Sequence, residues 1–210
     1  MINQNSQSPG LLRMQVYEYL RNKLNSGELK PRMITRISEI CKAVNMSTSP
    51  VRDALIHLQA EGFITLLPQR GVQINEMSVS DVTELYEILA GIESHILSKV
   101  FDRIGAGRIS KMKKINEEMH KAHLKNDYQK YYLKNIAFHN VFMELSGNRQ
   151  LLHYTSILKE RLFAFTKQDW IGEWKESNYH EHLKLIEFIE NGDCRQATDY
   201  LRNVHWTYNP

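Results

Sequence analysis

The chain has 210 residues, 42% of them apolar, which suits one or two ordinary folded domains. No apolar run approaches the roughly 18 residues of a transmembrane helix, and the N-terminus lacks the pattern of a secretory signal. These features argue against a membrane protein. Because Cys41 and Cys194 lie far apart, we expect free thiols and a cytoplasmic protein.

The net charge of +3 is unevenly distributed along the chain. Residues 1–76 carry nine Lys and Arg against six Asp and Glu, whereas residues 77–210 carry 18 of each kind. All of the excess positive charge therefore belongs to the first third. A small basic segment on a neutral body favours a polyanion as its partner.

The first third predicts three helices and a hairpin at residues 11–76, after a disordered tail at residues 1–10. Apolar residues recur at helical spacing from Leu12 to Leu24, then in a short second helix and in a third that Gly62 ends. "FITLL" and "GVQIN" read as two strands of a hairpin. Three helices followed by a hairpin predict a winged helix-turn-helix, a DNA-binding architecture.

From Ser78 onward the apolar pattern is wholly helical and short joints separate the helices. We therefore predict a mainly α protein, in which a winged helix-turn-helix is followed by an all-α six-helix bundle at residues 77–210. The predicted helices cover residues 82–100, 109–122, 128–146, 149–168, 178–190 and 194–208.

The start of the third helix carries the functional signal. Ser47, Thr48 and Ser49 place hydroxyl groups where open backbone N–H groups attract a phosphate, and such hydroxyls cap helices or contact phosphates and bases. Pro50 fits a first helical turn, which needs no N–H there. Arg52 leaves the face opposite the apolar residues, where it can bind a guanine or a phosphate.

Three more residues complete the candidate DNA-binding set. Arg70 and Gly71 lie at the hairpin tip, and Arg36 lies at the start of the second helix. Each residue alone also has an ordinary explanation, as a helix cap or a solvated side chain. Together with the localised charge, they predict that the partner is double-stranded DNA.

"SGELKP", "MSTSPVRDALIHLQAEGFI" and "QRGVQI" resemble the DNA-binding domain of GntR-type bacterial transcription regulators, over about residues 15–75. The helical remainder resembles the FCD-type effector domain of the FadR-like branch. This resemblance implies that Arg52 contacts DNA and that Ser49 and Gly71 occupy contact or wing positions. Thr48 stands where the family usually has an arginine, and Arg32 where it usually has a glycine, so we expect an altered operator preference.

Histidines of the helical segment suggest a second site. Asn135 and His139 lie four residues apart on one helical face, and His182 lies in register with inward-facing apolar residues. His205 lies one turn beyond Leu201. Imidazoles that converge from three helices can hold zinc, nickel or manganese, although a lone inward histidine is more often an ordinary core residue.

The family resemblance implies a metal site made of an Asp, a His four residues later and two His from the last two helices. His139 and His182 match, Asn135 replaces the aspartate, and the final position falls on Val204, so His205 comes one residue late. One residue is about 100° of helix rotation, which displaces a ligand unless the helix shifts. The effector of such domains is often a carboxylate, but Leu89 stands where an arginine is common.

We therefore predict a ligand-responsive regulator that binds a near-palindromic operator as a homodimer, with residues 77–210 for dimerisation and effector binding. One alternative is a DNA-binding regulator whose degenerate pocket senses no ligand. A metal-dependent hydrolase is disfavoured, because neither Glu144 nor Glu181 shares the helical face of the histidines and no catalytic motif is present. We expect no enzymatic activity.

Overall fold

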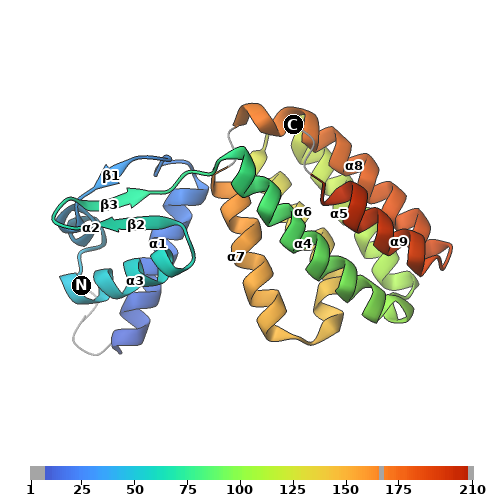
Figure 1. Cartoon of the computed structure of the whole chain (residues 1–210), viewed down its shortest axis with the longest axis horizontal. Coiled ribbons are helices and arrows are strands. Elements are labelled where there is room, and N and C mark those ends of the chain that lie inside the picture. The colour runs from blue at the N-terminus through green and yellow to red at the C-terminus, as the bar shows by residue number, and fades with distance from the viewer. Residues whose placement is uncertain (1–7, 166–167, 208–210) are drawn as a thin grey trace. The chain divides into compact units, whose positions relative to one another are not determined.

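The computed structural model describes residues 8–165 and 168–207, and the chain divides into two compact units, Met1–Glu76 and Met77–Pro210 (Figure 1). The first unit contains three helices and three strands. These elements are α1 (Pro9–Asn25), β1 (Ile34–Thr35), α2 (Ile37–Val44), α3 (Thr48–Ala60), β2 (Ile64–Leu67) and β3 (Gly71–Ile74).

Helix α1 begins earlier than the sequence predicts. Its N-cap is Ser8, whose hydroxyl accepts a hydrogen bond from the Leu11 N–H, and Pro9 occupies the first turn. A capping serine followed by proline starts a helix efficiently, because proline has the required φ angle and lacks only an unneeded N–H. The prediction of a disordered tail at residues 1–10 is therefore wrong for residues 9 and 10, which are helical. Residues 1–7 lie outside the described residues.

The sheet of the first unit has the antiparallel order β1-β3-β2. The hairpin β2–β3 was predicted from the sequence, whereas β1 was not. Two residues are too few to show the alternating pattern of a strand. Strand β1 pairs Ile34 with Gln73 and Thr35 with Val72.

Helices α1 and α3 pack against each other and form the core of the first unit. The predicted apolar face of α3, made of Val51, Leu55 and Leu58, is fully buried. Arg52 on the other face is exposed, as the helical spacing predicts. Burial of one face therefore fixes which side chains α3 presents to solvent.

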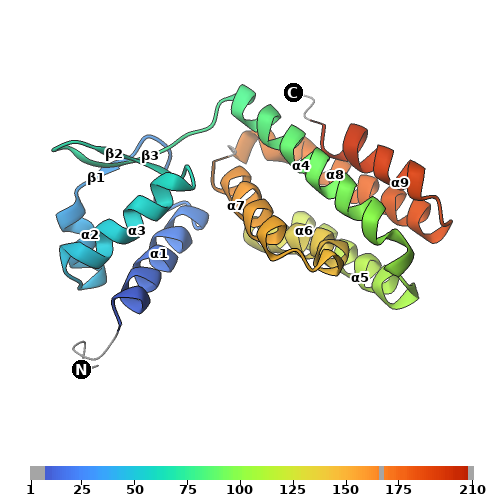
Figure 2. The same ribbon diagram turned by 60° about the horizontal axis from the view of Figure 1, so that its bottom comes forward.

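The second unit is an all-helical bundle, as predicted. Helix α4 contacts α6, α7 and α9, and it lies between α7 and α9 in both views (Figures 1 and 2). The helices are α4 (Val79–Val100), α5 (Ala106–Leu124), α6 (Tyr128–Met143), α7 (Arg149–Phe165), α8 (Gln168–Glu190) and α9 (Cys194–Tyr200), with 3₁₀ turns at Phe101–Arg103 and Glu144–Ser146.

Two helix boundaries differ from the predictions. Helix α8 begins at Gln168 and not at residue 178, and the side chains of residues 166–176 lie outside the described residues. The last predicted helix is interrupted, because α9 continues as a π-helical segment, Leu201–His205, before the chain leaves the helix. Among the described residues, no helix combines the length and apolar character needed to cross a bilayer.

Candidate DNA interface and metal centre

The N-terminal end of α3 is open to solvent. Ser47 is the N-cap, and its hydroxyl makes no capping hydrogen bond. Ser47, Thr48 and Ser49 are all exposed, whereas Pro50 is buried against the unit. The first turn of α3 therefore presents hydroxyl groups and open N–H groups to an incoming anion.

The structure brings the three predicted arginines together. Arg36, Arg52 and Arg70 line one groove of about 500 Å³, between the start of α2, the outer face of α3 and the hairpin. All three are exposed, and none forms an ion pair within the described part of the chain. No aspartate or glutamate is among the described residues that line the groove, so positive charge is concentrated there.

Gly71 has a structural reason to be glycine. Its φ angle is +112°, and a Cβ atom there would lie 2.3 Å from the carbonyl oxygen of Thr35. Only glycine allows β3 to approach β1 this closely. The role of Gly71 is thus to shape the hairpin that carries Arg70, and no side chain is available for a contact.

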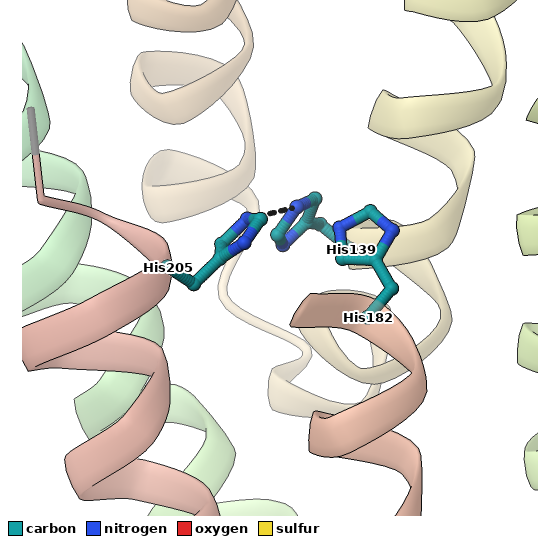
Figure 3. Close-up of side chains that lie close together, drawn as sticks. All are labelled: His139, His182 and His205. Carbon is teal, nitrogen blue, oxygen red and sulfur yellow. Dashed lines mark hydrogen bonds between the residues drawn. The ribbon is translucent and has the colours of Figure 1, made fainter. Parts of the chain in front are cut away.

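Three buried histidines converge in the second unit. His139 comes from α6, His182 from α8 and His205 from the π-helical segment, and Figure 3 shows their rings directed toward one another. One nitrogen of each ring lies within 4.8 Å of the others. The Nε2 atoms of His139 and His205 are 3.2 Å apart. The side chains are 5% exposed or less, so water is largely excluded.

The Nδ1 atom of each ring lies close to an acceptor. His205 Nδ1 lies 2.8 Å from Glu181 Oε2. His182 Nδ1 lies 3.0 Å from Asn116 Oδ1, and the Asn116 amide nitrogen donates to a backbone carbonyl. An ionised carboxylate and an amide oxygen only accept, so Nδ1 carries a proton in both rings. His139 Nδ1 lies 2.7 Å from Glu93 Oε2 in an ion-pair contact without hydrogen-bond geometry.

The Nε2 atoms of the three rings point into the cluster. Those of His139 and His205 lie 3.2 Å apart, and the buried Nε2 of His182 has no hydrogen-bond partner among the described residues. A cation bound between the three rings would satisfy this buried nitrogen. Nδ1 atoms held by acceptors behind the ring are typical of histidine metal ligands, so the residues fit a divalent metal.

Burial keeps two of the three histidines neutral, the form that can bind a metal. It lowers the pKa of His139 to about 4, although the Glu93 carboxylate acts in the opposite direction. Burial also lowers the pKa of His182 well below its usual value, and the nearby histidines add to this effect. Both imidazoles are neutral at pH 7 and need not lose a proton to bind a metal.

The π-helical segment explains how His205 reaches the site. Counting along a regular helix assigns the inward position to Val204, yet Val204 is 43% exposed and His205 is 5% exposed. A π-turn holds one residue more than an α-turn, so Leu201–His205 absorbs the extra residue. The displacement expected from the sequence is corrected by the helix itself.

Asn135 lies one turn before His139 on α6 and is half-buried. Its Oδ1 is buried and has no hydrogen-bond partner among the described residues. An unsatisfied buried acceptor is rare, and an amide oxygen is a possible though weaker metal ligand. Its assignment as a fourth metal ligand stays a prediction.

Glu93 and Lys159 adjoin the cluster and were not predicted from the sequence. Glu93 is fully buried on α4, forms an ion pair with Lys159 of α7 and accepts a 3.0 Å hydrogen bond from Trp206 Nε1. Burial alone raises the pKa of Glu93, but His139 and Lys159 together lower it below its usual range. Glu93 could have been noticed, because it lies four residues after Leu89 on the apolar face of α4.

Glu181 contacts the cluster although it precedes His182 by one residue on α8. Its Oε2 lies 2.8 Å from His205 Nδ1, a contact between distant segments that the spacing along one helix does not predict. The pKa of Glu181 is lowered, since the hydrogen bonds from His205 and Ser177 outweigh the opposing effect of burial. Glu144, in contrast, is exposed in a 3₁₀ turn, as expected.

The comparisons with known proteins agree with this architecture. The family profile "Bacterial regulatory proteins, gntR family" matches residues 12–74, and the profile "FCD domain" matches residues 84–204. The chain belongs to the GntR family. It is a bacterial transcription regulator with a DNA-binding helix-turn-helix unit and an FCD effector domain, and not an enzyme.

Two curated relatives match this GntR regulator over most of its length. The "Uncharacterized HTH-type transcriptional regulator YdhC" of Bacillus subtilis is 23% identical over 90% of this chain and 85% of its own. The "HTH-type transcriptional repressor GlaR" of Escherichia coli is 23% identical over 89% of each chain.

Solved structures share the fold. McbR of E. coli superimposes with a TM-score of 0.72 and 18% identity, covering 92% of this chain and 93% of its own. A GntR regulator from Rhodococcus sp. RHA1 gives a TM-score of 0.74 and 18% identity, covering 90% and 91%.

Proposed function

We propose that this regulator binds a near-palindromic DNA operator as a homodimer. The groove shared by Arg36, Arg52 and Arg70 supports this, because three unpaired guanidinium groups surround the outer face of α3. In a winged helix-turn-helix the N-terminal end of this helix enters the major groove. Two such units joined by dimerisation bind a two-fold operator far more tightly than one.

The roles of the individual residues follow from their positions. Arg52 binds a guanine edge or a phosphate, and Ser47, Thr48 and Ser49 bind phosphate oxygens or bases at the start of α3. Arg70 reaches the adjacent groove or backbone from the hairpin that Gly71 shapes. Arg36 adds a phosphate contact from the start of α2.

In the second unit, His139, His182 and His205 hold one divalent ion, zinc, nickel or manganese, with Asn135 as the fourth protein ligand. The observation that carries this proposal is the convergence of three buried imidazoles, each with one ring nitrogen within 4.8 Å of the others and its Nδ1 close to an acceptor. A bound metal supplies a cross-link between α6, α8 and the π-helical segment. Its main effect is stabilisation of the effector domain.

The helical unit then binds a small-molecule effector and changes operator affinity. A ligand has this effect only if it binds one arrangement of the dimer more tightly than the other, for example two different spacings of the recognition helices. Operator affinity measured with and without the effector tests this step, and equal affinities would contradict it.

A second candidate is a regulator that senses no ligand. The indole of Trp206 favours it, because the ring packs 5.2 Å from His139 and 5.1 Å from His205 and covers part of the cluster. A protein that contains no metal and that no small molecule stabilises would support this alternative over the sensing regulator.

The DNA proposal is tested by selecting bound duplexes from a random pool and measuring their affinity at several salt concentrations. Arg52→Ala is expected to weaken the binding of the protein to the selected operator by about 1–3 kcal/mol for each half-site. Lys30→Ala, which removes an exposed cation outside the groove, is the control. Equal affinities of the two variants would refute the assigned interface.

The metal proposal is tested by elemental analysis of the purified protein after incubation with zinc, nickel or manganese. We expect one ion per chain, and loss of that ion in His182→Ala. His95→Ala is the control, because His95 lies exposed on α4. Retention of the metal by His182→Ala would refute the site.

A further inference from the structure

A second cavity lies beside the histidine cluster. It has a volume of about 300 Å³, at the lower end of small-molecule sites, and lies between α4, α8 and the end of the π-helical segment. His139 and His182 do not line it. The described lining residues are Tyr86, Ser177, Asn178, Glu181, Asn203, Val204, His205 and Thr207.

The imidazole of His205 separates this cavity from the cluster. Its Nε2 faces His139, whereas its Nδ1 faces Glu181, which lines the cavity. The two nitrogens lie on opposite sides of the ring, so the cavity adjoins the Nδ1 side. A molecule in this cavity meets Glu181 and not the three converging Nε2 atoms.

Glu181 is the carboxylate of the cavity. No lysine, arginine or further carboxylate is among the described lining residues. The carboxylate already accepts hydrogen bonds from His205 and Ser177, but its side chain is 17% exposed and each oxygen has two lone pairs. It therefore keeps capacity for a further donor.

The other lining groups suit a small polar molecule. Asn178 and Asn203 contribute amides, Ser177 and Thr207 contribute hydroxyls, and Tyr86 contributes an aromatic ring. Aromatic rings attract ammonium groups through their negative faces. A carboxylate ligand, in contrast, would place a second negative charge beside Glu181, and no lysine or arginine is among the described lining residues to compensate it.

We propose that this cavity binds a small organic ammonium ion, held by Glu181. The inference rests on the proposed sensing function, and it differs from the carboxylate effectors that the family resemblance implies. The ligand shares the Glu181 carboxylate with His205 Nδ1, and this carboxylate orients the His205 ring. Ligand and metal occupancy are therefore coupled, and the coupling is reciprocal.

The proposal is tested by calorimetry of the zinc-loaded protein with three four-carbon probes of different charge: 1,4-diaminobutane, 1,4-butanediol and succinate. We expect the diamine to bind at least about tenfold more tightly than succinate, with the diol between them. A preference for succinate overturns the proposal, and so does the failure of all three probes to bind.

Two variants test whether the charge of this cavity decides which probe binds more tightly. Glu181→Gln is expected to remove the preference for the diamine. Asn203→Lys leaves the Glu181–His205 contact in place and adds a cation to the cavity, so it is expected to favour succinate. Glu187→Gln is the control, because Glu187 lies exposed on α8 outside the cavity. A diamine preference that survives Glu181→Gln overturns the assignment.

Zinc content and operator affinity are measured on the same preparations. Normal zinc and DNA binding without a diamine preference overturns the charge assignment alone. A protein that binds neither zinc nor any duplex overturns the proposed function as well.

Discussion

The buried pair of Glu93 and Lys159 allows a quantitative test of the second unit. The two side chains are 0% and 6% exposed, so neither charge is solvated by water. Lys159→Met keeps the length of the side chain but leaves the Glu93 carboxylate buried with its main cationic partner removed. Breaking such a pair costs about 3–5 kcal/mol, and two charges about 4 Å apart at an effective dielectric constant of about 20 give a similar value of about 4 kcal/mol.

The expected loss is measured by urea and thermal unfolding in the presence of a chelator, so that metal binding does not contribute. All three tryptophans, Trp170, Trp174 and Trp206, belong to the second unit, so tryptophan fluorescence reports on that unit alone. For a unit of this size, about 4 kcal/mol corresponds to a decrease in Tm of about 12 °C.

Two further variants separate charge from packing. Lys184→Met removes one partner of an exposed ion pair on α8 and is expected to cost less than about 1 kcal/mol. Adding Glu93→Gln to Lys159→Met neutralises the buried charge and keeps an oxygen acceptor for His139 and Trp206, so much of the stability should return. A loss below about 1 kcal/mol for Lys159→Met, or strictly additive effects in the double variant, would refute the reasoning.

Three other predictions concern the hairpin, the metal and the π-helical segment. Gly71→Ala is expected to destabilise the hairpin by about 2–3 kcal/mol, since its Cβ meets the Thr35 carbonyl; hydrogen exchange of residues 64–74 measures this, and unchanged exchange contradicts it. Removing zinc from the saturated protein is expected to lower the Tm of the second unit by about 12 °C, if zinc is present at about 1,000 times its Kd; equal Tm values with and without chelator would exclude a stabilising metal. Deleting Val204 is expected to convert the π-turn into an α-turn and to preserve zinc binding, whereas inserting an alanine after Val204 should abolish it; the zinc content of both variants decides, and loss of zinc on deletion would show that the π-turn does not set the register.

The DNA-binding unit was predictable because its signals are local. The apolar spacing of Val51, Leu55 and Leu58 fixes the buried face of α3, and this alone sends Arg52 to the exposed face. Helical periodicity needs no knowledge of the partners in the core. The same reasoning placed His139 and His182 inside the bundle.

Other features of the sites depend on contacts between distant segments. Whether His205 joins the cluster depends on a π-turn. Such a turn forms when the packing of the helix end against other elements stabilises the fold by more than the irregular turn costs. Glu181 and Glu93 find their partners 24 and 46 residues away, on other elements. The sequence thus determined the two kinds of unit and the exposed face of α3, because backbone periodicity decides these locally. Only the tertiary structure decided the third histidine, the acceptors behind the rings and the charge of the neighbouring cavity, because these depend on which helices pack together.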